Sequence, residues 1–210
     1  MEHSGLEPQQ FAVAAVRGTL GASSDVDSCV TLTSRIDALM GQAFEYFRKE
    51  GASVACRAGC SFCCHLRVMV YPHEAIALFR YLGARLAREQ ADLVRQRLLG
   101  NATHRGCAFL IDGQCSAYEA RPSACSGYHS LSKEHCEKAY DGGESSEGTP
   151  VLQALRHVAA ALADGISQAL QACDLNAEPL ELQSAVAALL RNPALIERWR
   201  SGRKLLQDPR

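Results

Sequence analysis

The sequence predicts a mainly α-helical fold, in which helices surround a small irregular cysteine-rich centre and one β-hairpin. Three observations predict it. Apolar residues recur at helical spacing in several long segments. Four cysteines fall in a stretch without any hydrophobic period, and an Asp-Gly step separates two short apolar runs. A chain of 210 residues can bury a core of its own, so the cysteines are not needed as staples.

The first part of the chain predicts one long helix. Residues 1–28 mix Gly, Ser, Gln and Pro with little periodicity, so we expect a loose or partly helical lead-in. From Thr31 to Glu50 apolar residues recur every three or four positions, and Gly51 supplies a stop signal. Residues 29–140 are then expected to form a cysteine-cluster domain.

The middle of the chain predicts an irregular loop, more helix and a hairpin. Residues 52–65 have no period and hold four cysteines, which indicates a loop wrapped around a bound centre. Pro72 suits the first turn of a helix, with helical character reaching Gly100. Asp112-Gly113 predicts a tight hairpin that brings Cys107 and Cys115 together.

The last third of the chain predicts a C-terminal helical segment. Residues 141–150 are a polar stretch of Gly, Ser and Glu, typical of a linker. Residues 151–210 hold two Ala- and Leu-rich helical patterns, 151–173 and 179–190, followed by a short segment. We expect these helices to form a layer against the rest of the fold.

Charge and hydropathy exclude several classes of partner. The formal net charge is -1 with both signs interspersed, which predicts no nucleic-acid partner. No apolar stretch approaches the roughly 20 residues that cross a bilayer, which predicts no membrane partner. The first residues lack the basic region and cleavage pattern of an export signal. The expected location is the cytoplasm, where thiols persist as free groups or metal ligands.

The spacing of the cysteines predicts metal ligation. Cys56-x-x-x-Cys60-x-x-Cys63-Cys64 places four of the ten cysteines within nine residues. Zinc and iron–sulfur centres need thiolates that converge from a folded-back loop, and gaps of two or three residues let one turn present two sulfurs. Adjacent cysteines cannot both point the same way in extended backbone, so one of the pair ligates while the other reaches a second centre or packs. A second group follows on the hairpin and the next turn: Cys107, Cys115 and Cys125.

Other polar residues near the cysteines have competing interpretations. Arg121 is our candidate for a cation that stabilises a thiolate centre, and a surface ion pair is the alternative. Cys29 and Cys173 lie in apolar helical patterns and are expected to be buried hydrophobes, whereas Cys136 fits either role. His129 and His135 are expected as neighbours of the site that donate or accept hydrogen bonds.

The segments CRAGCSFCCH and CAFLIDGQCSAYEARPSAC resemble the YkgJ-like CxxCxxCC family of zinc- or iron-chelating domains. The resemblance covers about residues 52–130 and depends on the Cys-Cys pair, the Cys-x-Phe-Leu-x-Asp-Gly-x-Cys hairpin and the Tyr-x-x-Arg-Pro-x-x-Cys run. It implies zinc or iron as the cofactor, with an iron–sulfur cluster as one form. The metal ligands that it implies are Cys56, Cys60, Cys63, Cys64, Cys107, Cys115 and Cys125.

Three functions stay open from the sequence. The first, which we favour, is a metal-binding module without catalysis. The second is an iron–sulfur enzyme or maturation factor, because Cys56-x-x-x-Cys60-x-Phe62-Cys63 matches the spacing of radical SAM enzymes and flagellin lysine methylases are similar in their cysteine motif. No SAM-binding glycine loop or alternating β/α pattern accompanies it. The third is a thiol-redox protein or zinc sensor that uses Cys63 and Cys64 as a reactive pair. No protein partner is indicated.

Overall fold

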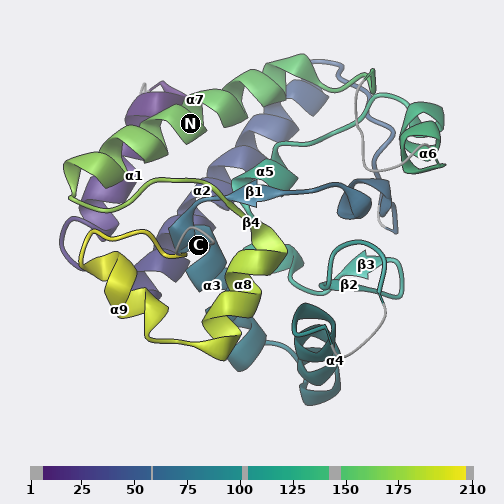
Figure 1. Cartoon of the computed structure of the whole chain (residues 1–210). Coiled ribbons are helices and arrows are strands. Elements are labelled where there is room, and N and C mark those ends of the chain that lie inside the picture. The colour runs from purple at the N-terminus through teal and green to yellow at the C-terminus, as the bar shows by residue number, and fades with distance from the viewer. Residues whose placement is uncertain (1–6, 58, 101–103, 142–147, 207–210) are drawn as a thin grey trace.

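The computed structural model describes residues 7–57, 59–100, 104–141 and 148–206. Its fold is mainly α-helical with a small amount of antiparallel sheet, which confirms the predicted class (Figure 1). The long helices pack around one apolar core, and the cysteine-bearing loop and hairpin lie at the side of this core. The helices are α1 (Pro8–Thr19), α2 (Val26–Lys49), α3 (Pro72–Ala84), α4 (Arg88–Leu98), α5 (Ser123–Ser126), α6 (Lys133–Asp141), α7 (Gln153–Ala172), α8 (Leu182–Arg191) and α9 (Leu195–Arg200).

Helix α1 is a packed element of the core. Ala12, Ala15 and Val16 are fully buried, and the helix lies along α7. Gly165 of α7 permits the close approach, because an added Cβ would overlap the backbone carbonyl oxygen of Gln9. Residues 8–19 are therefore a packed helix, the second of the two forms, loose or partly helical, that we expected for this part of the chain. A buried stripe made mostly of alanine has a weak hydrophobic period, which is why the sequence did not decide between the two.

Helix α2 crosses the core and begins five residues before the predicted start. Its N-terminus is set by Asp25, whose side chain accepts a hydrogen bond from the Ser28 backbone N–H at 2.7 Å. Leu32, Ile36 and Met40 are buried on the side that meets α3 and α7. The side chain of Asp37, further along α2, faces the cysteine region.

Helix α3 begins at Pro72, as predicted, and a two-stranded sheet precedes it. Strand β1 (Met69–Val70) pairs antiparallel with β4 (Leu180–Glu181), so that Val70 lies opposite Leu180. The pairing places α8 against α3 and α4. The residues on both sides of the cysteine loop are thus fixed to the C-terminal helices.

The hairpin is confirmed, with β2 (Leu110–Ile111) paired antiparallel to β3 (Gln114–Cys115). Asp112 and Gly113 form its two-residue turn with φ of 50° and 75°. This left-handed backbone is the conformation that Asp-Gly steps favour in tight hairpins. The turn sets the register that places Cys115 opposite Leu110.

The predicted linker lies mostly outside the described residues, which resume at Gly148. An isolated antiparallel bridge joins Ser130 to Val151 just beyond it. Helix α7 then packs on α1, α2 and α5. The C-terminal helices therefore share one core with the rest of the chain, while the domain boundaries themselves stay a prediction.

Candidate metal centre

The predicted cysteine ligands come from three segments that the fold brings together. Cys63 and Cys64 lie on the short 3-10 helix η1 (Phe62–His65), whereas Cys107 precedes β2 and Cys115 is the last residue of β3. Cys125 lies on α5. The backbone N–H of Cys107 donates to the carbonyl oxygen of Cys64 at 2.6 Å, which fastens the hairpin segment to the loop.

Cys63 is the thiol that the other segments share as a neighbour. Burial raises the pKa of Cys107 to about 11, and nearby Cys115, Glu181 and Cys63 add to the increase. Burial also raises the pKa of Cys125 well above its ordinary value, with Cys107, Cys63 and Cys115 contributing. Burial likewise raises the pKa of Cys115, with Cys63 again a contributor. These four thiols are therefore close enough to repel one another as thiolates.

The vicinal cysteines Cys63 and Cys64 are joined by a hydrogen bond. The hydrogen bond from the Cys64 thiol lowers the pKa of Cys63, and the positive charge of Arg121 lowers it further. The same hydrogen bond raises the pKa of Cys64, and burial adds to that effect. Cys63 is thus the acceptor of this hydrogen bond and Cys64 is the donor, and both residues lie on the same short turn.

Arg121 lies beside the cysteines and also forms an ion pair. Its Nε donates to Asp37 Oδ1 at 3.2 Å, and its guanidinium stacks over the Tyr118 ring at 4.1 Å from the centroid. Its side chain is only 18% exposed. The charge of Arg121 lowers the pKa of both Cys63 and Cys115. The side chain is therefore a cation beside the thiols and a member of an ion pair at the same time, so the two interpretations do not exclude each other.

Cys56 and Cys60 lie on the irregular loop that leads into η1. The Cys56 sulfur accepts a hydrogen bond from the Ser130 N–H at 3.3 Å. Burial raises the pKa of Cys56, and the neighbouring thiols Cys60, Cys63 and Cys136 add to the increase. The loop therefore places Cys56 near Cys60, Cys63 and Cys136.

Cys136 is a neighbour of the site that our ligand set did not include. It is buried on α6 and affects the pKa of Cys56. The feature of the sequence that could have pointed to Cys136 is its position in LSKEHCEK, shortly after Cys125 and within reach of the same region. A lone cysteine without a partner at ligand spacing does not decide between packing and ligation.

Glu74 positions the segment that carries Cys125. Its Oε1 accepts hydrogen bonds from the backbone N–H and the hydroxyl of Ser123, both at 2.8 Å, and its Oε2 accepts from the Tyr71 N–H at 2.8 Å. The residue is buried. One carboxylate therefore holds the first turns of α3 and α5 together.

The remaining candidates lie apart from this cluster or in supporting positions. Burial raises the pKa of Cys29 to about 12, and no other cysteine contributes. Cys173 follows the end of α7 and packs against the core. His129 stacks on Phe44 with the ring centroids 4.1 Å apart, and His135 is an exposed residue of α6. The roles of the two histidines stay a prediction.

The donor set suits a soft or borderline metal. All ten cysteines are free thiols, and thiolates bind both zinc and iron. In the part of the chain that the structure describes, no three His, Cys, Asp or Glu side chains have the arrangement that could hold a metal ion. The thiols are thus neighbours whose sulfurs do not meet at one point. The position of a cysteine sulfur changes when a single side-chain torsion rotates, so rotation can bring neighbouring thiols together. The residues therefore have the chemical type that such an ion binds.

Comparison with known proteins agrees with this chemistry. Residues 55–142 match the model of the CxxCxxCC family, described as "Putative zinc- or iron-chelating domain". All seven predicted ligands and Cys136 fall inside the matched segment. No curated protein and no solved structure matches the chain. None of the helices in the described ranges is both long and apolar enough to span a membrane. Over residues 55–142 the chain is thus similar to the CxxCxxCC family, whose description is a zinc- or iron-chelating domain.

Proposed function

We propose that the protein is a cytoplasmic metal-binding protein that holds zinc or iron through clustered cysteine thiolates. The observation that carries the proposal is the position of Cys63 beside thiols from the hairpin and from α5. The cytoplasmic location is part of the proposal because thiols persist there as free groups or metal ligands. The proposed ligands are drawn from the seven cysteines of the loop, the hairpin and α5: Cys56, Cys60, Cys63, Cys64, Cys107, Cys115 and Cys125.

The electrostatics of the cluster favour a bound cation. Burial and mutual repulsion raise the pKa of most of these thiols, so ionising several of them together without a metal is costly. A divalent cation reverses this balance, because a coordinating thiol loses its proton. Binding then joins the loop to the hairpin, and its free energy adds to the stability of this region.

The number of thiols leaves room for more than a single tetrahedral ion. A structural zinc site uses four ligands, and Cys63, Cys64, Cys107, Cys115 and Cys125 already exceed that number. Cys56 and Cys60 add two more on the loop that leads into η1, and both Cys60 and Cys63 affect the pKa of Cys56. A cluster with several irons, or a second ion, would use the additional sulfurs.

Purification without oxygen or chelators tests the proposal and separates the two metals. We expect stoichiometric zinc in a colourless protein, or stoichiometric iron. An iron–sulfur cluster would add acid-labile sulfide and visible absorption. Metal analysis and an absorption spectrum of the same sample give the answer. Protein that contains neither metal, or whose cysteines are paired in disulfides, would refute the proposal.

The ligand assignment is tested by replacing one cysteine inside the cluster and one outside it. We expect Cys115→Ser to weaken metal binding by at least tenfold, because even the neighbours of metal ligands contribute about 10- to 100-fold to affinity. Cys173→Ser is the matched control, since this residue packs at the end of α7. Metal content after dialysis against a competing chelator measures both. Equal losses in the two variants would show that Cys115 is not a ligand.

A further inference from the structure

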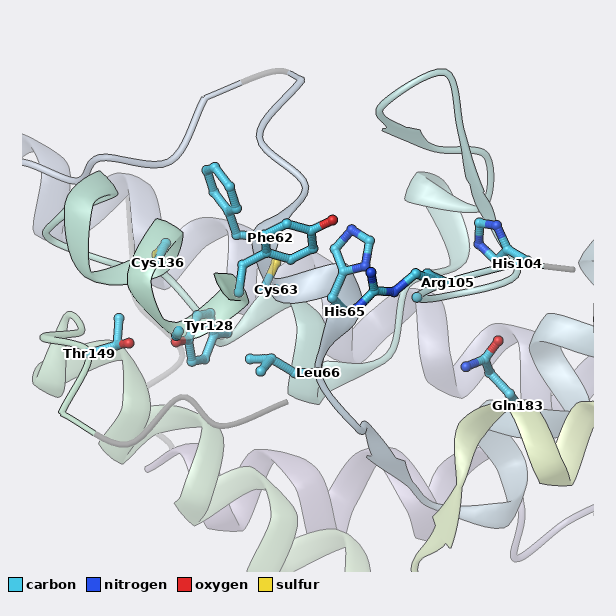
Figure 2. A pocket seen from close by; sticks show the side chains of 13 residues that line it. Phe62, Cys63, His65, Leu66, His104, Arg105, Tyr128, Cys136, Thr149 and Gln183 are labelled. Atoms are coloured by element: carbon cyan, nitrogen blue, oxygen red, sulfur yellow. The ribbon is translucent and has the colours of Figure 1, made fainter. Parts of the chain in front are cut away.

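A cavity of about 350 Å³ lies beside the cysteine cluster, and most of the residues that line it are not proposed metal ligands. Its walls come from η1, from residues 104–106, from α6 and from α8. Cys63 lines it, so the cavity reaches the cysteine cluster (Figure 2). Ligand pockets in proteins begin at about this size, which is enough for a small organic molecule.

One end of the cavity is cationic. Arg105 and His104 lie at this end, and the described residues that line the cavity include neither Asp nor Glu (Figure 2). Arg105 is exposed and forms none of the ion pairs found between described residues. Its guanidinium is a fork of donors suited to carboxylate or phosphate. This end therefore favours an oxyanion.

The other end is aromatic and apolar. The Tyr140 ring meets Phe62 edge-on with centroids 5.9 Å apart, and it meets His65 in the same way at 4.6 Å. Leu66 and Ala139 add apolar surface. Figure 2 shows Phe62 and Tyr128 on the side away from Arg105, with His65 between the two ends. A ligand that filled the cavity would thus be charged at one end and apolar at the other.

The backbone holds the two ends in place. Gly106 has φ of 94°, and an added Cβ would lie 2.6 Å from His65 Nδ1, so glycine is needed for this ring to pack against the segment. His104 Nε2 is 2.8 Å from the carbonyl oxygen of Cys107. Gln183 accepts the Ala108 N–H through Oε1 at 2.8 Å, which leaves its amide nitrogen as a donor. His65, His104 and Gln183 are therefore positioned by the fold before a ligand arrives.

We propose that this cavity binds a small organic oxyanion, a phosphate monoester or carboxylate carried on an aromatic or apolar body, with Arg105 holding the anionic group and Tyr140 and Phe62 packing against the body. The inference concerns a ligand distinct from the metal. It depends on the cavity and its side chains alone.

Titration calorimetry on the full-length, metal-loaded protein tests the proposal. The probes are phenyl phosphate, phenylacetate and inorganic phosphate. We expect one site for phenyl phosphate or phenylacetate, and the stronger of the two identifies the oxyanion. Inorganic phosphate should bind more weakly, because it lacks the apolar body. Absence of binding by both aromatic probes at millimolar concentration would overturn the proposal.

Three variants assign the two ends of the cavity. Arg105→Gln should weaken the aromatic probe by about tenfold or more, the usual contribution of a charged hydrogen bond. Arg67→Gln removes the same charge from an exposed residue outside the cavity and should leave binding unchanged. Tyr140→Ala should weaken the aromatic probe and leave inorganic phosphate unaffected. Equal weakening by Arg105→Gln and Arg67→Gln would show a diffuse charge effect and refute the site. Unchanged melting temperature and metal content establish that each variant is folded.

Discussion

Replacing Glu74 with alanine should lower the free energy of unfolding by about 3 kcal/mol or more. The substitution leaves three donors without their acceptor: the Tyr71 N–H, the Ser123 N–H and the Ser123 hydroxyl. Each buried group that loses its partner costs about 1–3 kcal/mol. Glu74 is 2% exposed, so water does not readily replace the carboxylate. Urea denaturation followed by circular dichroism measures the change.

The control for Glu74 is an acidic residue with a surface contact. Glu119 lies 3.9 Å from Arg85, and both side chains are about 70% exposed. Glu119→Ala should change the free energy of unfolding by less than about 0.5 kcal/mol, the usual range for a surface substitution. If the two variants were equally stable, the link between α3 and α5 would not matter for the fold. Glu74→Ala should also reduce metal content, because α5 carries Cys125.

Gly165→Ala should destabilise the protein by about 2 kcal/mol, within the range found for overpacked cores. The sign is informative, because alanine normally stabilises a helix relative to glycine by about 1 kcal/mol. Here the new methyl group would overlap the Gln9 carbonyl oxygen and lie 2.8 Å from the Ala12 Cβ. A backbone atom of a packed helix cannot easily move aside, so α1 would separate from α7.

Gly41 of α2 provides the matched control for this effect. An added Cβ there meets nothing within 4 Å, so only helix propensity acts on the substitution. Gly41→Ala should therefore raise the free energy of unfolding by about 0.5–1 kcal/mol. Thermal or urea denaturation of both variants compares the two signs. A stabilising Gly165→Ala would mean that α1 does not pack on α7 as the structure has it.

The elements that could be predicted from the sequence are those with a local cause. Pro72 marks a helix start because proline fits the first turn, and Asp112-Gly113 forms a tight turn because both residues accept positive φ. The long apolar stripe of α2 could also be predicted, because its helical spacing is visible within one stretch of the sequence. The ligand candidates followed from spacing, and the structure brings Cys63, Cys107, Cys115 and Cys125 near one another.

The elements that could not be predicted depend on contacts between distant parts of the chain. Strands β1 and β4 have two residues each, too short for an alternating pattern, and each finds its partner only in the folded chain. The bond from Ser123 to Glu74 joins two helix starts that no spacing rule relates. The hydrophobic stripe of α1 is made of alanine, and Cys136 stands alone in sequence. In each case the energy comes from tertiary packing.

The pairing of β1 with β4 and the packing of α8 on α3 make the cysteine segment depend on parts of the chain outside it. Residues 55–142 contain α3, yet the apolar sides of α3 rest on α2 and α8, which lie outside that range. Cutting the gene at the limits of the family match would strip these partners away and leave Ile76, Leu78 and Leu82 open to solvent. Grafting the segment onto a new scaffold therefore requires a host that supplies both missing helices.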